Sequence, residues 1–258
     1  MTRMFAHHQA LISGCISFAV ILLGWQLAVD LGLVQVFFTS TPVRVAVAFW
    51  QEFRSGEIAA NVGVSLYELF CGLALACVAG IGLGALASWS RTIEHVLEPF
   101  IWFTYACPII AFYPLFIAWL GLGAPTIIAI AFLSALTPLY ANTLSGIKTA
   151  DQELMRAARS FGARRRDLFL KVALPGSVPI VVAGLRLAVG RGLTGVIAGE
   201  LFGAAAGLGY SIAFYGQKLK TTEMMVSLVL VVIVGVILTQ LLSLCEAATD
   251  SWRTGPGR

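Results

Sequence analysis

The sequence predicts an all-α membrane protein with about six transmembrane helices, and three features of the chain lead to this prediction. First, 59% of the 258 residues are hydrophobic and only 12% are charged, and the mean hydropathy is +0.88, which is outside the usual range of soluble domains. Second, the chain contains repeated apolar runs of about 20 residues, the length of a helix that crosses a bilayer. Third, one segment, residues 148–175, is too polar to lie in hydrocarbon.

The first apolar run covers residues 11–29 and poses a choice between a transmembrane helix and a signal peptide. The run is longer than the usual core of a signal peptide, and no small-residue cleavage pattern follows Asp30. We therefore interpret it as the first span. The remaining spans are expected at about 65–89, 99–120, 125–146, 178–199 and 224–245.

The segment between the first two spans has a different pattern. Its apolar side chains are spaced as in an amphipathic helix that lies on the outer membrane surface: Val43, Val47, Phe49, Trp50 and Phe53. We therefore divide the chain into an N-terminal part, residues 1–60, a core of residues 61–250 and a cytoplasmic tail of residues 251–258.

Glycine and proline indicate how the spans pack. Small residues allow close helix contacts in membranes, and the second expected span carries Gly72, Gly80, Gly82 and Gly84. Pro108 and Pro114 in the third expected span leave backbone groups without partners. Such groups are tolerated only where protein or a water-filled path satisfies them, so we expect this helix to lie inside the bundle.

The residue pattern of the polar segment 148–175 predicts two short helices joined by a turn. Thr149 and Gln152 have the spacing of a capping box, and Gly162 is placed to end the first helix in a left-handed conformation. Pro175 is expected to end the second helix. Apolar side chains recur at helical spacing along one face of each helix: Leu154, Ala157, Ala158 and Phe161 in the first, and Leu168, Phe169, Val172 and Ala173 in the second.

Charge places this segment in the cytoplasm. It holds seven basic and three acidic residues and so carries +4, the net charge of the whole chain. Lys and Arg concentrate on the cytoplasmic side of membrane proteins. Eleven of these residues fall on one side of the predicted spans (Arg3, Arg91, the seven of the segment, Arg253 and Arg258) and four on the other (Arg44, Arg54, Lys218 and Lys220). Both termini are therefore predicted to be cytoplasmic.

A solvated basic loop is one interpretation of the segment, but the adjacent small residues Ala157 and Ala158 on the apolar stripe favour a docking surface. Two alanines, a glycine four residues later and a Val-x-Leu-Pro ending resemble the EAA loop of permease subunits of ATP-binding-cassette (ABC) importers. The residues are Ala157, Ala158, Gly162, Val172, Leu174 and Pro175.

The resemblance implies a type I (MetI-like) permease fold in a bacterial inner membrane. It also implies a homodimer, two cytoplasmic ATPase subunits that use ATP and Mg²⁺, and an extracytoplasmic solute-binding protein. The loop, including Phe161, would insert into a groove on the ATPase and transmit its closure. The family usually has a glutamate where this chain has Arg156, and Glu153, one turn earlier, can partly replace that charge.

Three further stretches resemble one branch of these permeases, which is associated with nitrate, sulfonate, taurine and pyrimidine-type substrates. They are residues 106–123, 184–200 and 204–210. The resemblance implies a pathway for a small, anionic solute, while specificity resides largely in the binding protein.

Charged residues inside predicted spans are the candidates for this pathway, because ionisable groups in a membrane usually face the bundle interior. Arg186, Arg191 and Glu200 qualify, although Arg186 lies near a span end where its side chain can reach lipid headgroups. We expect Arg191 to lower the barrier for an anion; the alternative is an ion pair with Glu68 or Glu200. Pro108 is a further candidate, and so are the aromatic residues Tyr105, Phe112, Tyr113 and Phe116, which form either a gate or ordinary packing.

Other functional classes find no support in the sequence. The chain has no phosphate-binding loop of the G-x-x-x-x-G-K-[ST] type, so ATP hydrolysis requires another polypeptide. No catalytic constellation or metal-binding spacing is visible, and no cofactor is expected on this chain. A membrane-tethered basic loop with an apolar stripe is a poor candidate for nucleic-acid binding. A secondary transporter or channel that needs no ATPase remains the alternative.

Overall fold

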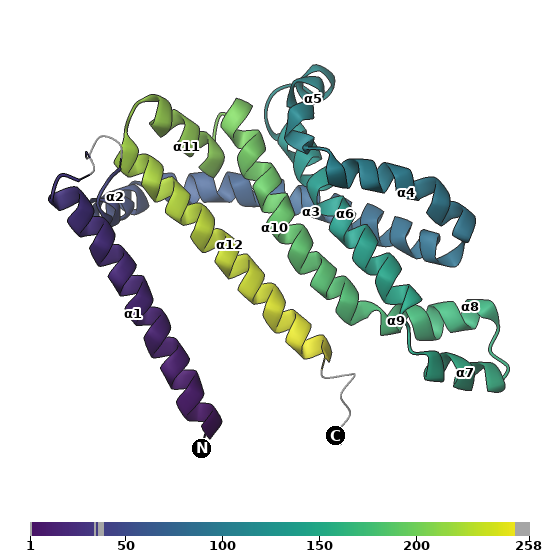
Figure 1. Cartoon of the computed structure of the whole chain (residues 1–258). Helices are drawn as coiled ribbons and strands as arrows, with labels where there is room; N and C mark the ends of the chain where they lie inside the picture. Colours follow the sequence, from purple (N-terminus) through teal and green to yellow (C-terminus); the bar gives the residue numbers. More distant parts are fainter. Residues whose placement is uncertain (1, 34, 36–38, 251–258) are drawn as a thin grey trace.

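The computed structural model describes residues 2–33, 35 and 39–250, with residues 2–12, 15 and 247–250 described by their backbone only. This part of the chain is helical and contains no strand (Figure 1). Arg3 is thus described by its backbone alone, and Arg253 and Arg258 lie outside the described residues. The elements are α1 (Thr2–Asp30), α2 (Pro42–Ser55), α3 (Glu57–Trp89), α4 (Arg91–Ala106), η1 (Ile109–Phe112), α5 (Tyr113–Leu120), α6 (Ala124–Lys148), α7 (Gln152–Ser160), α8 (Arg165–Leu168), η2 (Phe169–Ala173), α9 (Leu174–Gly176), α10 (Val178–Gly203), α11 (Leu208–Gln217) and α12 (Thr221–Asp250).

Helix α6 is the centre of the bundle and packs between α3 and α10. Glycines on α3 make the first contact possible. A methyl group built at Gly72 would lie 2.7 Å from the Ala131 Cβ, and at Gly80 it would lie 2.8 Å from the Leu139 Cβ. Gly84 approaches Thr143 in the same way, whereas Gly82 has open space around it. Three of the four glycines predicted to pack therefore do so, and the fourth faces outward.

The contact between α6 and α10 follows the same rule. A methyl group at Gly195 would lie 2.8 Å from the Ser134 Oγ, and Ala188 is fully buried against Ala135 and Leu139. Small residues thus face α6 from both sides, which lets backbones approach closely where van der Waals contact is the main attraction between helices.

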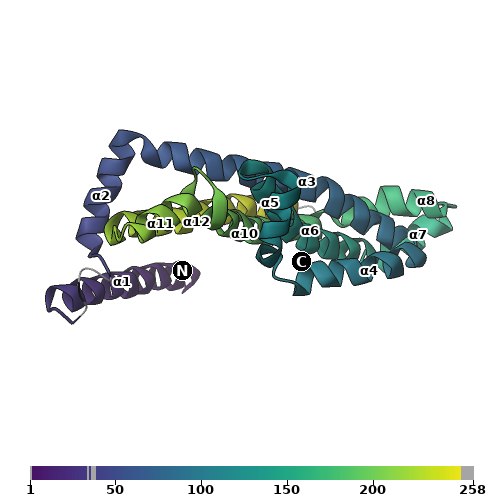
Figure 2. The same cartoon turned by 90° about the horizontal axis from the view of Figure 1, so that it is seen from above.

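A second core lies at the end of the bundle that contains α2 and α11. It is formed by Val45, Ile58, Leu208, Val226 and Leu230. The predicted amphipathic helix is present as α2, with Val43, Val47, Trp50 and Phe53 exposed and Val45 buried. The C-terminal part of α1 lies at this end of the bundle, and its Trp25 packs against the core (Figure 1). Figure 2 shows the same helices from above.

The third expected span, residues 99–120, is bent in the structure, and it has the length and hydropathy of a span only if the pieces on both sides of the bend are counted together. Helix α4 ends at Ala106, and the following helical pair η1–α5 is turned by 91° relative to it. The physical reason is Pro108, which has no N–H and favours an extended conformation at the preceding residue. Cys107 has φ −83° and ψ 133° accordingly.

Length and hydropathy identify four candidate spans among the described residues, or five if the bent pair counts as one: Glu57–Trp89, Ala124–Lys148, Val178–Gly203 and Thr221–Glu246, and the pair Arg91–Ala106 with Ile109–Leu120. The apolar part of α1, Ile16–Asp30, is shorter. The total of six spans therefore stays a prediction. The start of α1, the end of α12 and helices α7 and α8 lie toward the lower end in Figure 1, while α2, α5 and α11 lie toward the upper end.

Candidate functional site: a coupling segment and the cavity behind it

The segment 148–175, called the coupling segment below, is two helical pieces joined at Gly162. This glycine has φ +83°, the left-handed conformation predicted for it. The helix cap differs from the prediction: the Oδ1 atom of Asp151 accepts hydrogen bonds from the backbone N–H groups of Glu153 (2.8 Å) and Leu154 (3.3 Å). Thr149 instead donates its hydroxyl hydrogen to the Ser145 carbonyl at 2.8 Å. The aspartate caps α7 because its carboxylate is the stronger acceptor and carries charge that favours a helix N-terminus.

The second piece does not end at Pro175, which is a further correction. The chain passes from α8 through the π-helical turn η2 into α9, and Pro175 lies in the first turn of α9, a position that proline commonly occupies. Ser177 keeps a right-handed helical conformation and α10 follows directly. The coupling segment is therefore continuous with α10, and Val172 and Leu174 lie on this connection.

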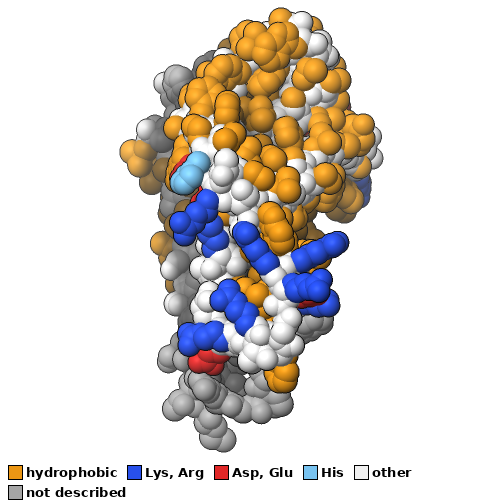
Figure 3. Space-filling model, turned by 90° about the vertical axis from the view of Figure 1, so that its right-hand side faces the viewer, with side chains coloured by type: hydrophobic (Ala, Val, Ile, Leu, Met, Phe, Trp, Pro, Cys, Tyr) orange, Lys and Arg blue, Asp and Glu red, His pale blue; other side chains and the backbone are white. Residues whose placement is uncertain are grey.

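The apolar stripe of α7 faces away from the rest of the chain. Phe161 is 91% exposed and Leu154 is 58% exposed, and Ala157 lies exposed between them. By helical geometry, Arg156 lies on the opposite face of α7. Lys and Arg side chains gather around the lower part of this side of the molecule, below a largely hydrophobic surface (Figure 3). An apolar knob of this kind, rimmed by charge, is typical of a protein-binding surface.

The other face of the segment is anchored to the membrane helices. Ile147, Ala150 and Ala173 form a small buried core with Met155 and Phe169 packed against it. The rings of Trp89 and Phe169 meet edge to face with centroids 5.0 Å apart. Arg165 adds a hydrogen bond from Nη2 to the Trp89 carbonyl, 2.7 Å long.

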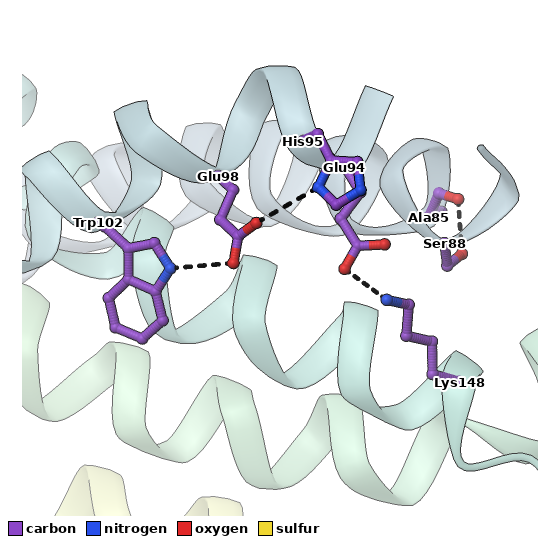
Figure 4. A network of polar contacts seen from close by, with 7 residues as sticks. All are labelled: Ala85, Ser88, Glu94, His95, Glu98, Trp102 and Lys148. Carbon is purple, nitrogen blue, oxygen red and sulfur yellow. Dashed lines mark hydrogen bonds and ion pairs between the residues drawn. The ribbon is translucent and has the colours of Figure 1, made fainter. Parts of the chain in front are cut away.

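A second connection joins the beginning of the segment to α4. Lys148, the last residue of α6, forms an ion pair with Glu94 in the first turn of α4 (Figure 4). Glu98, one turn further along α4, accepts a 3.4 Å hydrogen bond from the Trp102 indole and lies 3.8 Å from His95. Glu94, Glu98 and Trp102 follow one another along one face of α4.

That face forms one wall of a cavity of about 720 Å³ between α4, α6 and α10. Glu94 and Lys148 lie at its end near the coupling segment, and Tyr105 and Arg191 lie at its deep end. A smaller cavity of about 300 Å³ shares Tyr105, Thr137 and Arg191 and continues toward the α4–η1 break.

Arg191 therefore lies between two adjoining cavities. Its guanidinium carbon is 4.8 Å from the centre of the Tyr105 ring, a cation–π contact. No carboxylate among the described side chains forms an ion pair with Arg191, so the predicted alternative of a pair with Glu68 or Glu200 is not found.

The other pathway candidates lie elsewhere. Arg186 pairs with Glu246 of α12 at 3.0 Å. Glu200 is only 1% exposed, accepts hydrogen bonds from the Ser65 hydroxyl and the Gly209 N–H (each 2.6 Å), and so holds the start of α11. Tyr113 is buried with its ring 5.8 Å from that of Phe202, and Pro108 forms the break after α4.

Sequence reasoning missed two features of this site. The contacts of Trp89 with Arg165 and Phe169, and the pair between Lys148 and Glu94, join residues more than fifty positions apart. The only available signal was opposite charge at the ends of two expected spans.

Comparison with known proteins identifies the class. Residues 76–245 match the family model described as the binding-protein-dependent transport system inner membrane component. The chain belongs to this family. It is thus an inner-membrane permease subunit of an ABC importer, and ATP is hydrolysed by a separate ATPase; a transporter independent of an ATPase is not favoured.

Individual relatives of this permease refine the comparison. It is 31% identical to the putative aliphatic sulfonates transport permease protein SsuC of Bacillus subtilis (strain 168), over 91% of this chain and 85% of the relative. It is 29% identical to the taurine transport system permease protein TauC of Escherichia coli (strain K12), over 91% and 87%. These relatives fall in the branch that the sequence resemblance indicated.

Solved structures confirm the fold. Two inward-facing crystal forms of the MetNI methionine ABC transporter contain chains that superpose with TM-scores of 0.63 and 0.68 at 22% and 20% identity. The alignments cover 73% and 77% of the permease and 94% and 98% of those chains. The predicted MetI-like fold is therefore confirmed.

Proposed function

We propose that the permease conducts a small organic or inorganic anion of the sulfonate, taurine or nitrate type, delivered by a binding protein, through the cavities that meet at Arg191. The observation that carries this proposal is the position of Arg191, an unpaired guanidinium at the junction of two cavities. A fixed positive charge lowers the electrostatic barrier for an anion in a low-dielectric pathway. The names of the sulfonate and taurine relatives support the same solute class.

The proposed assembly is a homodimer of permease subunits with two cytoplasmic ATPases and one binding protein. In it, the apolar face of α7 and Phe161 enters the ATPase groove, and Ala157 and Ala158 allow close approach. We further propose that residues 61–250 are the transporting core, since the family match lies within them. Residues 1–60 then serve as an added span and outer-surface helix, and 251–258 as a cytoplasmic tail.

The test is uptake of candidate anions into proteoliposomes that contain the complete importer. A ligand screen on the cognate binding protein first selects the anion among sulfonates, taurine, nitrate and pyrimidines. We expect Arg191→Gln to reduce uptake by about 10-fold or more, because a desolvated charge contact contributes on the order of 2 kcal/mol, and Arg191→Lys to retain part of it. Unchanged uptake and unchanged salt dependence in Arg191→Gln would contradict a pathway role.

A further inference from the structure

Two residues of the coupling segment, one before α7 and one after it, contact the same corner of the membrane domain. Helix α3 ends at Trp89 and α4 begins at Arg91, so residues 89–94 form a sharp corner, the α3–α4 corner. Lys148, just before α7, pairs with Glu94 on one side of this corner. Arg165, just after the Gly162 turn, bonds to the Trp89 carbonyl on the other. A displacement of the segment therefore acts on this corner directly.

The corner is also the inner end of the Arg191 cavity. Glu94 and Lys148 both line that cavity, and α4, which begins at the corner, forms its wall up to Tyr105. The Glu94 side chain is 17% exposed and that of Lys148 is 46% exposed, so their contact lies at the boundary between the cavity and the outside. Figure 4 shows the lysine reaching from the end of α6 across to α4.

We propose that the Lys148–Glu94 ion pair is a latch on the cytoplasmic mouth of the Arg191 cavity. The latch holds α4 against the end of α6, and it opens when the ATPases displace the coupling segment and carry Lys148 with it. This inference rests on the proposed function and adds two positioning residues to it. Neither side chain binds the solute, and both control the distance between α4 and α6.

A simple electrostatic role makes different predictions, because the two partners have opposite charge. Without Lys148, Glu94 and Glu98 leave a negative mouth that repels anions; without Glu94, Lys148 leaves a more positive one. If the ion pair instead sets the width of the mouth, loss of Lys148 and loss of Glu94 should both widen it. A neutral probe separates the two cases, since its access depends on width and not on charge.

The experiment measures the reaction rate of a cysteine placed in the cavity. Ala141 lines the cavity and is exposed, so Ala141→Cys is introduced after replacement of the five native cysteines, one of which, Cys107, lines the smaller cavity. The complete importer with its ATPases is labelled from the cytoplasmic side with an uncharged maleimide and with a sulfonate-bearing thiol reagent. We expect Lys148→Ala and Glu94→Ala each to speed labelling by the uncharged reagent several-fold.

Two further variants complete the design. The double exchange Lys148→Glu with Glu94→Lys restores an ion pair and should return labelling toward the parent rate, although both charges then oppose the helix dipoles. Arg91→Ala removes an exposed cation from the same corner and leaves the latch intact, so its rate should not change. Three results would overturn the latch. The labelling rate could be unchanged in both single variants, or the uncharged reagent could label one single variant faster and the other more slowly. The double exchange could also be labelled as fast as the single variants.

Failure of the latch and failure of the proposed function have separate signatures. The unmodified importer is assayed in parallel for anion uptake and for copurification of the ATPase. If these are normal while the labelling results contradict the latch, only the latch is wrong. If the unmodified importer takes up none of the anions, the proposed function is wrong.

Discussion

Arg165 and Trp89 are joined in two ways: the guanidinium Nη2 donates a 2.7 Å hydrogen bond to the Trp89 carbonyl, and the guanidinium carbon lies 5.1 Å from the centre of the indole ring. The residues are 76 positions apart. Trp89 is the last residue of α3, and Arg165 follows the glycine turn of the coupling segment. The contact ties the coupling segment, the proposed docking site of the ATPase, to a helix of the transmembrane core.

We therefore predict that Arg165→Ala uncouples ATP hydrolysis from transport. The lost hydrogen bond and cation–π contact contribute on the order of 1–3 kcal/mol together, too little to unfold the protein. The variant should still copurify with the ATPase, but the importer that contains it should hydrolyse more ATP for each solute molecule imported. The measurement is the ratio of ATP hydrolysed to solute taken up in proteoliposomes. Arg166→Ala, a neighbouring exposed cation, is the control, and an equal ratio in the two variants would argue against the tether.

The α3–α6 contact yields a matched pair of variants. At Gly80 an added methyl group would lie 2.8 Å from the Leu139 Cβ and 3.1 Å from the Leu136 carbonyl oxygen, whereas at Gly82 it would meet open space. Overpacking of this kind costs about 1–3 kcal/mol. We expect Gly80→Ala to lower the thermal unfolding midpoint in detergent and Gly82→Ala to leave it unchanged. Equal midpoints would show that α3 and α6 do not pack as described.

Glu200 is predicted to matter for stability through the start of α11. Its carboxylate accepts hydrogen bonds from the Ser65 hydroxyl and the Gly209 N–H, and the Leu208 N–H donates to the Ser65 Oγ at 2.9 Å. Glu200→Ala leaves the Ser65 hydroxyl and the Gly209 N–H without their acceptor, at a cost of about 1–3 kcal/mol. Glu200→Gln keeps one acceptor oxygen and should be intermediate. Thermal unfolding of the three proteins tests this order, and an Ala variant as stable as the parent would refute the anchoring role.

The end of the molecule that contains α2 and α11 should respond to pH through Glu52. This carboxyl faces a cavity of about 650 Å³ between α2, α11 and α12, and burial, together with Glu57 and Glu223, raises its pKa from 4.5 to about 7, against a smaller opposing effect of Lys220. The pKa of Tyr215 in the same cavity is raised to about 12, so it stays neutral.

Because the folded state holds the Glu52 proton more tightly than the unfolded state, its contribution to stability is complete below pH 4.5 and is lost as pH rises to about 7. We expect faster hydrogen exchange in α2 at pH 8 than at pH 5, after correction for the intrinsic pH dependence of exchange. Glu52→Gln should remove most of this difference. A difference that persists in the variant would assign the effect to other groups.

The local features of this permease were accessible from its sequence, because they depend on neighbouring residues. Apolar runs located the long helices, Gly162 located the turn, and the apolar spacing located the face of α7 that is exposed at Leu154, Ala157 and Phe161. The cap of α7 was assigned to Thr149 rather than Asp151 because two polar side chains near one helix start compete, and only their geometry decides.

Features that depend on distant contacts were not accessible. Glu200 was grouped with the pathway residues because a buried carboxylate in a span has no sequence signal for its partners, here Ser65 and Gly209. The same limit applied to Trp89, whose partners come from the coupling segment.

The central claim is that the apolar face of α7 binds the ATPase. Copurification of the ATPase with two matched variants tests this claim most directly. Phe161→Asp places a charge at the 91% exposed tip of the apolar stripe, and Gln152→Asp places the same charge on the opposite face of α7. Neither residue is buried, so both variants should fold. We predict that Phe161→Asp loses the ATPase while Gln152→Asp retains it; retention of the ATPase by Phe161→Asp would contradict the account.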